Sequence, residues 1–254
     1  MSQGIFITGT DTGVGKTVVA AGLAALFRKR GLSVGVMKPI QTGCPSRRGE
    51  RIATDARFLL QAAGALSKVN GRISNGASDG MDQVCPYRFK DPVAPLVAAE
   101  RDDVTIRLDR IAEAYRDLSA RHSIMVVEGI GGLLAPITQT VFSIDLALLL
   151  KLPVLVVSHT RLGTLNHTLL TIRWAQQMGA TVVGVVFNNP VPPTKSLAEK
   201  TNPLVFSRLS TVPVLGNIPF MRGMSVEKGR PGRVRNLGQY LNEGLHHLGI
   251  KLDP

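Results

Sequence analysis

The sequence predicts one α/β domain, spanning residues 1–254, in which a doubly wound and mostly parallel sheet has helices on both faces. Two observations support this fold class. Short runs of β-branched and other apolar residues alternate with longer amphipathic segments, as expected for strands that are buried on both faces. In addition, 254 residues, of which 44% are hydrophobic, are enough for a full-sized apolar core.

The order of the expected elements follows from this alternation. Strands are expected at residues 5–7, 34–36, 124–127, 154–157, 182–187 and 212–215. Helices are expected at residues 16–30, 54–63, 106–120, 143–150, 164–178, 195–209 and 233–248. Turn residues crowd the stretch 42–91, so we expect one helix and loops there, as an irregular insertion and not a second domain. The C-terminal segment 222–254 is unusually basic.

Charge and composition restrict the classes of molecule that the protein is expected to bind. The net charge is +12, but the basic residues are scattered and no stacking aromatics accompany them, so we expect no nucleic-acid partner. A basic surface of this kind does suit small anionic ligands. No apolar run is long enough to span a bilayer, and Cys44 and Cys85 form no CxxC pair. We therefore expect a cytoplasmic protein with reduced thiols and no membrane partner.

The strongest chemical signal is the stretch 9–17, which reads GTDTGVGKT between the first expected strand and the first expected helix. Its end matches the phosphate-binding loop GxxxxGK[ST], although the strict pattern would require glycine in place of Thr10. A strand before the loop and a helix after it are the context that this motif needs. The sequence therefore predicts a nucleotide-binding domain of the P-loop NTPase type.

The chemistry of a phosphate site explains the residue types in this loop. Gly13 and Gly15 permit unusual backbone conformations that bring several N–H groups around phosphate oxygens. The helix that begins near Lys16 points its positive end at the anion. Lys16 would neutralise charge on the β- and γ-phosphates, and the Thr17 hydroxyl is placed to ligate Mg²⁺.

Charged residues at other strand ends are further candidates, because ligands in open α/β sheets bind outside the carboxyl ends of the strands. Glu128 follows a buried strand and precedes the glycine-rich stretch 129–132, where such proteins place a carboxylate that faces the metal. The alternative is a solvated loop glutamate. Lys38 ends the second expected strand and either faces the phosphates or is an ordinary exposed lysine. Asp55 is either an Mg²⁺ ligand or a favourable charge in the first turn of a helix with Thr54 as its N-cap.

The amides at Asn188 and Asn189 follow the strand expected at 182–187. An asparagine side chain can pair with the edge of adenine, but Asn-Asn-Pro is equally a turn signal. His159, His167 and the pair His246-His247 have no metal-binding partners at useful spacing, so we read them as structural or exposed. We find no pattern typical of a nucleophilic triad.

The order and spacing of these motifs resemble the dethiobiotin synthetase family of the biotin pathway. The resemblance extends from about residue 3 to about residue 220 and includes the shifted first glycine of the phosphate loop. It rests on residues 9–17, Lys38-Pro39, Asp55, 128–132 (EGIGG), Asn188-Asn189 and 216–219 (GNIP).

This resemblance implies a homodimer and an ATP- and Mg²⁺-dependent ring closure of diaminopelargonic acid with CO₂. One substrate amine takes up CO₂ to form a carbamate, whose oxygen attacks the γ-phosphorus of ATP. The second amine then closes on the mixed carbamic-phosphoric anhydride, which gives the cyclic urea of dethiobiotin and releases phosphate. No protein nucleophile is needed, so positioning and electrostatic stabilisation would carry the catalysis.

The resemblance also implies roles for individual residues. The catalytic residues would be Lys38, Lys16 and Thr12, and the metal ligands would be Thr17, Asp55 and Glu128. Substrate contacts would come from Thr42 and Gly132. Residues that contact ATP would be Gly13, Val14, Gly15, Lys16, Thr17, Val18, Asp55, Glu128, Gly129, Ile130, Gly131 and, around the adenine, Asn188, Asn189, Asn217, Ile218 and Pro219. The stretch 162–171 would include an interface helix of the dimer.

Several positions depart from the family pattern. Leu96 stands where histidine is frequent, Gly13 where some members carry glutamate, and Thr42 where serine is frequent. Three other readings remain open. A related amide-forming synthetase usually carries an amidotransferase domain, for which we see no cysteine-centred motif. A partitioning or switch ATPase typically has lysine early in the loop, where this chain has Thr10 and Asp11. A bare binding module is expected only if Glu128 and Lys38 face solvent.

Overall fold

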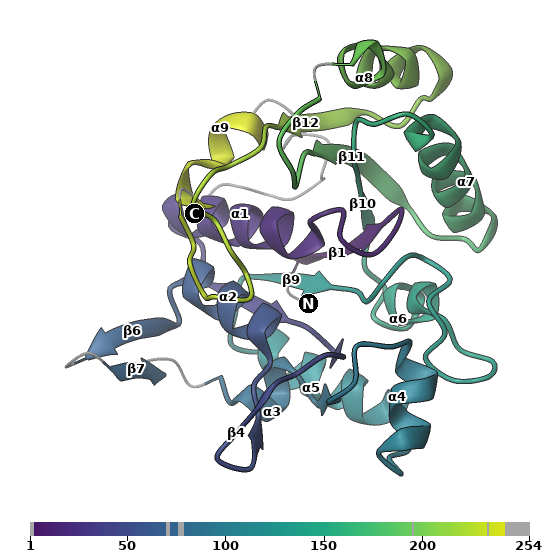
Figure 1. Ribbon diagram of the computed structural model, residues 1–254. Helices are drawn as coiled ribbons and strands as arrows, with labels where there is room; N and C mark the ends of the chain where they lie inside the picture. The colour runs from purple at the N-terminus through teal and green to yellow at the C-terminus, as the bar shows by residue number, and fades with distance from the viewer. Residues whose placement is uncertain (1–2, 70–71, 76–78, 195, 233, 242–254) are drawn as a thin grey trace.

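The computed structural model describes residues 3–69, 72–75, 79–194, 196–232 and 234–241. Six parallel strands form the main sheet, in the order β12-β11-β10-β1-β9-β2, and β1 lies at its centre (Figure 1). The strands are β1 (Gln3–Gly9), β2 (Val34–Met37), β9 (Ile124–Glu128), β10 (Val154–Ser158), β11 (Val182–Asn188) and β12 (Val214–Ile218). This arrangement confirms the predicted fold class.

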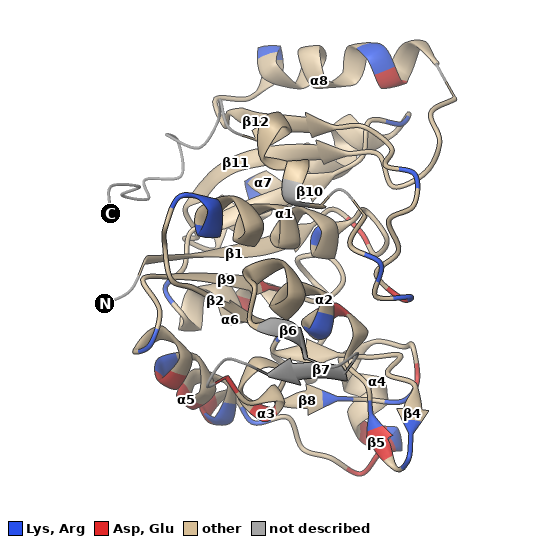
Figure 2. Cartoon of the chain, turned by 90° about the vertical axis from the view of Figure 1, so that its left-hand side faces the viewer, with Lys and Arg blue, Asp and Glu red and all other residues tan. Residues whose placement is uncertain are grey.

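Helices cover both faces of this sheet, which explains why the strands are apolar throughout. Figures 1 and 2 show α1 and α2 on one face and α6 and α7 on the other. Every residue of β9 and β10 is buried, as a strand covered on both faces requires. The principal helices are α1 (Lys16–Lys29), α2 (Thr54–Ala63), α5 (Leu108–Ser119), α6 (Ser143–Leu149), α7 (Thr164–Gln177) and α8 (Leu197–Leu209).

The insertion 42–91 contains more structure than the single helix and loops that we expected. Besides α2 its described residues contain α3 (Met81–Val84) and five short strands, of which the first four are β4 (Ser46–Arg47), β5 (Glu50–Arg51), β6 (Leu66–Val69) and β7 (Arg72–Asn75). Strand β8 (Tyr87–Arg88) pairs with β3 (Ile40–Gln41). Arg48 and Gly49 both have positive φ, which suits the tight turn of the hairpin between β4 and β5. Strands of two to four residues are too short to show an alternating pattern, so the sequence did not reveal them.

Element boundaries differ from expectation in three further places. Strand β12 begins two residues later than predicted, after Pro213, which lacks the N–H that a ladder position needs. Helix α4 (Pro95–Arg101) was not expected, although a proline at its first position is a usual start. Of the helix expected at 233–248, the described part holds a 3₁₀ turn (Val234–Asn236) and α9 (Gly238–Leu241). Residues 233 and 242–254, including His246 and His247, lie outside the described residues.

Charge and burial complete the description. Lys and Arg positions are spread over α1, α5, β4, β5 and several loops (Figure 2). Cys44 and Cys85 are free thiols in the buried core. Within the described part of the chain, no helix has both the length and the apolarity to cross a membrane.

Candidate active site

The phosphate loop follows β1, the central strand, whose neighbours are β9 and β10. At this position the chain connections diverge to the two sides of the sheet, which is where ligands bind in open α/β folds. Helix α1 begins at Lys16, directly after Gly15. Gly13 and Gly15 have φ angles of 79° and 95°, conformations that favour glycine.

Asn188, at the end of β11, holds the phosphate loop from one side. Its Nδ2 donates a hydrogen bond of 2.8 Å to the carbonyl oxygen of Val14. A Cβ atom on Gly15 would lie only 2.1 Å from this Nδ2. Gly15 therefore meets two requirements at once, because both its backbone angle and its contact with Asn188 exclude a larger residue.

Lys16 is buried at the start of α1 and directs its ammonium group back over the loop. Its Nζ donates a hydrogen bond of 2.8 Å to the carbonyl oxygen of Asp11. Burial, aided by the nearby charge of Lys38, lowers the pKa of Lys16 to about 8. An anion bound beside Lys16 would offset the free-energy cost of burying its positive charge.

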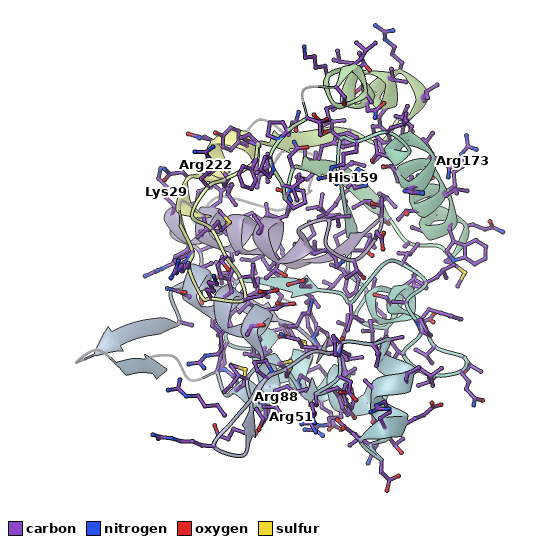
Figure 3. All side chains as sticks on the ribbon, viewed as in Figure 1. Lys29, Arg51, Arg88, His159, Arg173 and Arg222 are labelled. Atoms are coloured by element: carbon purple, nitrogen blue, oxygen red, sulfur yellow. The ribbon has the colours of Figure 1, made fainter. Side chains whose placement is uncertain are left out.

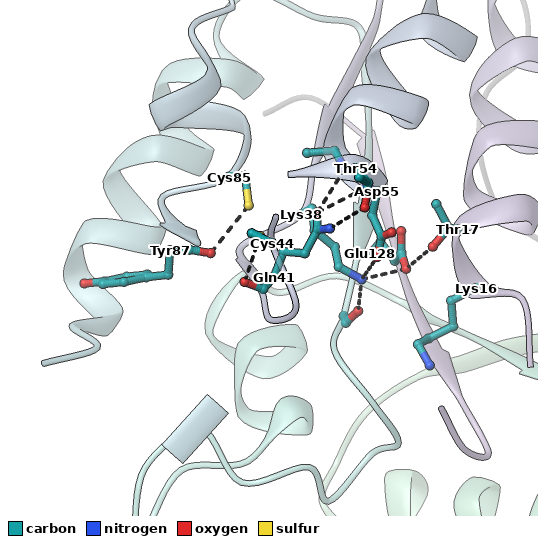
Figure 4. A network of polar contacts seen from close by, with 12 residues as sticks. Lys16, Thr17, Lys38, Gln41, Cys44, Thr54, Asp55, Cys85, Tyr87 and Glu128 are labelled. Atoms are coloured by element: carbon teal, nitrogen blue, oxygen red, sulfur yellow. Dashed lines mark hydrogen bonds and ion pairs between the residues drawn. The ribbon is translucent and has the colours of Figure 1, made fainter. Parts of the chain in front are cut away.

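Lys38 and Glu128 form the centre of a buried polar cluster, shown in Figure 4. They come directly after β2 and at the end of β9, and these strands are neighbours in the sheet. The Nζ of Lys38 lies 2.6 Å from Oε1 of Glu128 and 3.3 Å from Oδ2 of Asp55. It also donates a hydrogen bond of 3.1 Å to the carbonyl oxygen of Gly129. Thr17 donates to the same Oε1 of Glu128 at 2.8 Å.

The charges in this cluster depend on one another. Burial lowers the pKa of Lys38, but Glu128 and Asp55 outweigh that effect and hold the pKa above its ordinary value. Burial raises the pKa of Glu128, while Lys38 and Thr17 oppose the rise. Lys38 and Glu128 are both buried. A bare binding module was expected only if these two residues faced solvent, so the structure does not favour that reading.

The donor set around Glu128 fits an Mg²⁺ ion. Oε2 of Glu128 is buried and has no hydrogen-bond partner among the described residues. Thr17 and Asp55 add a hydroxyl and a second carboxylate to the same cluster. Mg²⁺ prefers oxygen ligands and usually keeps waters and substrate phosphates, so two carboxylates and a hydroxyl suffice. The cluster itself supplies two carboxylates. No group of three or more His, Cys, Asp and Glu residues in the described part of the chain is placed to hold a metal ion.

Gln41 is a residue of this site that the sequence analysis missed. Its Oε1 accepts hydrogen bonds from the backbone N–H groups of Asp55 at 3.1 Å and Ala56 at 3.4 Å. Its Nε2 donates to Oγ1 of Thr54 at 2.9 Å. Thr54 is therefore not the N-cap of α2, because the cap residue is Ala53 and the free N–H groups are satisfied from β3. No local motif reveals a cap supplied by a distant strand.

A cavity of about 790 Å³ unites most of the candidate residues. Its lining includes all the proposed catalytic, substrate and metal residues. The predicted residues on its wall are Thr12, Gly13, Gly15, Lys16, Thr17, Val18, Lys38, Thr42, Asp55, Glu128, Ile130, Gly131, Gly132, Asn188, Asn189 and Pro219. The structure thus brings together side chains from positions that are far apart in the sequence.

Four predicted residues are absent from this wall. Val14 and Ile218 are buried in the core, and Asn217 is exposed and accepts a hydrogen bond from Asn189. The N–H of Gly129, which the resemblance placed among the ATP contacts, donates to the carbonyl oxygen of Ile7. Gly129 continues the sheet hydrogen bonds past the end of β9 and cannot also face the cavity.

The amide of Asn189 is already engaged on both sides. Thr160 donates to its Oδ1 at 2.5 Å, and its Nδ2 donates to the carbonyl oxygen of Ile218 at 3.1 Å. These bonds join the end of β11 to the loop after β10 and to the end of β12, so the residue braces the wall of the cavity as well as lining it.

The cavity wall also includes two stretches that the sequence analysis did not select. One is 92–95, which leads into α4, and the other is 220–227, from which Met221, Met224 and Val226 contribute apolar surface. These three apolar residues lie within an otherwise basic segment. That contrast is the sequence feature that could have identified them as part of the site. Leu96, which departs from the family pattern, does not line the cavity.

Comparison with known proteins shows which family the chain belongs to. A family model described as an AAA domain matches residues 3–228. The chain is 35% identical, over 93% of its length and 96% of the relative's, to the ATP-dependent dethiobiotin synthetase BioD of Thermodesulfovibrio yellowstonii. It is 38% identical to the BioD protein of Bacillus licheniformis, with 88% of each chain covered.

Solved structures with a similar fold come from another group of ATPases. The septum site-determining protein MinD from Pyrococcus horikoshii superposes with a TM-score of 0.58 at 15% identity, covering 98% of this chain and 94% of its own. A ParA family ATPase from Chlorobium tepidum gives a TM-score of 0.58 at 11% identity, covering 97% and 100%. Identities this low establish the shared fold alone. The sequence relatives establish the family, and this chain belongs to the ATP-dependent dethiobiotin synthetases.

Proposed function

We propose that this protein catalyses the ATP- and Mg²⁺-dependent ring closure of diaminopelargonic acid with CO₂ to give dethiobiotin. The observation that carries the proposal is the buried cluster of Lys38, Glu128 and Asp55 beside the phosphate loop, on the wall of one large cavity. Membership of the dethiobiotin synthetase family supplies the substrate class.

The phosphate loop would bind the triphosphate of ATP. The N-terminal end of α1 and the loop amides suit the phosphate oxygens, and Lys16 would compensate their charge. Asn188 fixes the loop through Val14, so its contribution to nucleotide binding is to position backbone donors. Pro219 and Asn189 would form part of the adenine pocket, because both line the far side of the cavity.

Thr17, Asp55 and Glu128 would hold Mg²⁺, as the unpartnered Oε2 of Glu128 supports. When bound, the ion would supply positive charge that neutralises the negative charge on the group being transferred. Lys38 lies between Asp55 and Glu128 in the free protein, and its ammonium group would turn toward the phosphoryl and carbamate oxygens in the complex.

The reaction would then proceed without a protein nucleophile. One amine of the substrate adds to CO₂ and loses a proton to give a carbamate. A carbamate oxygen displaces ADP from the γ-phosphorus, and the second amine attacks the carbonyl carbon and expels phosphate. Lys16, Lys38 and Thr12 would stabilise the charge that moves between these oxygens, and Thr42 and Gly132 would contact the diamine.

A homodimer is part of the proposal. On α7, Leu170 and Trp174 are one helical turn apart and are 60% and 38% exposed, and Leu162 just before the helix is 88% exposed. Apolar side chains aligned on one helix face suit contact with a second copy of the chain. We also propose a cytoplasmic location, to which the two free buried thiols are suited.

Phosphate release tests the proposal directly. We expect purified protein with MgATP and bicarbonate to release phosphate only when diaminopelargonic acid is added, with one dethiobiotin formed per phosphate. Release that ignores the diamine would indicate a switch ATPase of the kind that shares this fold. Release that requires a different amine or acid would indicate another amide-forming synthetase.

A further inference from the structure

A second cavity, of about 690 Å³, lies outside the candidate active site and is lined by arginines. Arg51, Arg57, Arg88 and Arg110 reach it from β5, α2, β8 and α5. Figure 3 shows Arg51 and Arg88 together beside the β4 strand. Four guanidinium groups from four separate elements form a site that the fold assembles, and not a basic run of sequence.

Glu50 and Asp82 line this cavity and Asp102 pairs with Arg51, so the acidic residues do not fully balance its four arginines. Arg51 pairs with Asp102 at 3.0 Å, and Arg88 pairs with Asp82, whose side chain is 78% exposed. Within the described residues neither Arg57 nor Arg110 has a carboxylate at ion-pair distance. An exposed pair such as Arg88–Asp82 contributes little to stability, so a ligand can displace Asp82 at low cost.

Arg51 and Arg88 are held by their acid partners, whereas Arg110 is held by packing on an aromatic ring. The guanidinium carbon of Arg110 lies 4.9 Å from the ring centroid of Tyr87, which is buried. The buried Nη1 atom of Arg51 lies 3.0 Å from Oδ2 of Asp102, so this arginine already has an acid partner. Arg57 and Arg110 have no carboxylate partner among the described residues, and such guanidinium groups can bind an anion through paired hydrogen bonds.

We propose that this arginine cavity binds a small anion of the phosphate class that carries two or more negative charges. Guanidinium groups bind phosphate oxygens through paired hydrogen bonds, and several of them together match a multiply charged group. Asp55 and Arg57 both lie in the first turn of α2, but Asp55 lines the cavity of the phosphate loop and Arg57 lines the arginine cavity. The second site is therefore separate from the first, and the proposal does not depend on the reaction proposed above.

Equilibrium dialysis with radiolabelled pyrophosphate tests this site by counting bound anions. The intact protein is expected to bind two per chain, one at the phosphate loop and one at the arginine cavity. The double variant Arg57→Gln/Arg110→Gln is expected to bind one, because the affinity of the arginine cavity for pyrophosphate falls at least about tenfold. The matched control is Arg173→Gln, an exposed arginine on α7 far from the cavity in Figure 3.

The same dialysis repeated with saturating MgADP distinguishes inorganic phosphates from the phosphates of a nucleotide as the ligand of the arginine cavity. If MgADP removes only the site that survives in the double variant, the arginine cavity takes inorganic phosphates. If MgADP removes both sites, the cavity takes the phosphates of a nucleotide. One site in the intact protein, or equal weakening in Arg173→Gln and in the double variant, would overturn the proposal, since general basic charge would then explain the binding.

Discussion

Gln41 is bound to the helix that carries Asp55: its Oε1 accepts the backbone N–H of Asp55 at 3.1 Å. The amide is 3% exposed and lies on the wall of the cavity, so it caps α2 from inside the site. This cap fixes the first turn of the helix, and with it the carboxylate that we assign to Mg²⁺. Gln41 is thus a positioning residue that does not itself need to touch the ion.

Replacing Gln41 by methionine should therefore loosen Asp55. We expect Gln41→Met to raise the Mg²⁺ concentration for half-maximal activity severalfold and to lower the free energy of unfolding by about 1 kcal/mol, as for other lost helix caps. Amide hydrogen exchange at Asp55 and Ala56 should become faster. Gln41→Glu, which keeps an acceptor, should restore slow exchange, and Gln61→Met near the other end of α2 should change neither quantity. Unchanged exchange at Asp55 would contradict the role.

The Lys38–Glu128 pair gives a second prediction. Lys38→Ala should lower the rate of diamine-dependent phosphate release by about 10²–10³, the usual effect of removing a group that stabilises charge in the transition state. The variant also leaves Glu128 and Asp55 without their cation, so its folding should be checked by circular dichroism. Lys29→Ala, on the exposed end of α1, should release phosphate at the rate of the unmodified protein. A loss below about threefold in a folded Lys38→Ala protein would remove Lys38 from the catalytic residues.

Two glycines of the phosphate loop provide a matched comparison. Both have positive φ, but a Cβ on Gly13 would meet nothing within 4 Å, whereas one on Gly15 would strike Asn188. Gly13→Ala should weaken ATP binding about fivefold, which is the effect of about 1 kcal/mol of backbone strain. Gly15→Ala should weaken it well over tenfold, because Asn188 must also give up its bond to Val14. Titration calorimetry with ATP measures both, and equal losses would show that Asn188 does not hold the loop.

The sequence predicted the sheet, the phosphate loop and the acidic and basic residues at strand ends, because each depends on local pattern. Glu128 and Lys38 were found by the rule that ligands gather at carboxyl ends of parallel strands, and their strands prove to be neighbours. Gln41 was missed, and Asn188 was expected as a contact for adenine and not as a support of the phosphate loop. Their side chains bond to the backbone of segments remote in sequence, and no pattern in one segment reports a partner in another.

The insertion 42–91 also makes contacts with a remote segment that its own sequence does not report. Asp79 precedes Gly80 in the stretch 42–91, where we expected turns, but its side chain is buried and bound by two residues that precede β9. Arg121 lies 3.0 Å and His122 2.8 Å from its carboxylate oxygens. These contacts tie the insertion to the main sheet. They were not predictable, because Asp-Gly is a common turn whether or not its carboxylate finds a partner.

Asp79 leads to a prediction about pH. Burial raises its pKa, but His122 and Arg121 outweigh that effect and hold the pKa below its ordinary value. A carboxyl group with a depressed pKa in the folded state adds stability above the pKa of the unfolded chain, about 3.9, and loses it as the pH falls through the folded value. We therefore expect Asp79→Asn to lower the free energy of unfolding by about 1–3 kcal/mol at pH 7.

The pH dependence of that loss distinguishes the ion pair from simple packing. The difference in unfolding free energy between the unmodified protein and Asp79→Asn should stay constant down to about pH 4 and shrink below it, because Asp79 then becomes neutral in both states. Urea titrations at several pH values measure it. Asp103→Asn, at an exposed position just after α4, should show almost no difference at any pH. A difference for Asp79→Asn that stays the same into acid would mean that shape, and not charge, holds the insertion against the sheet.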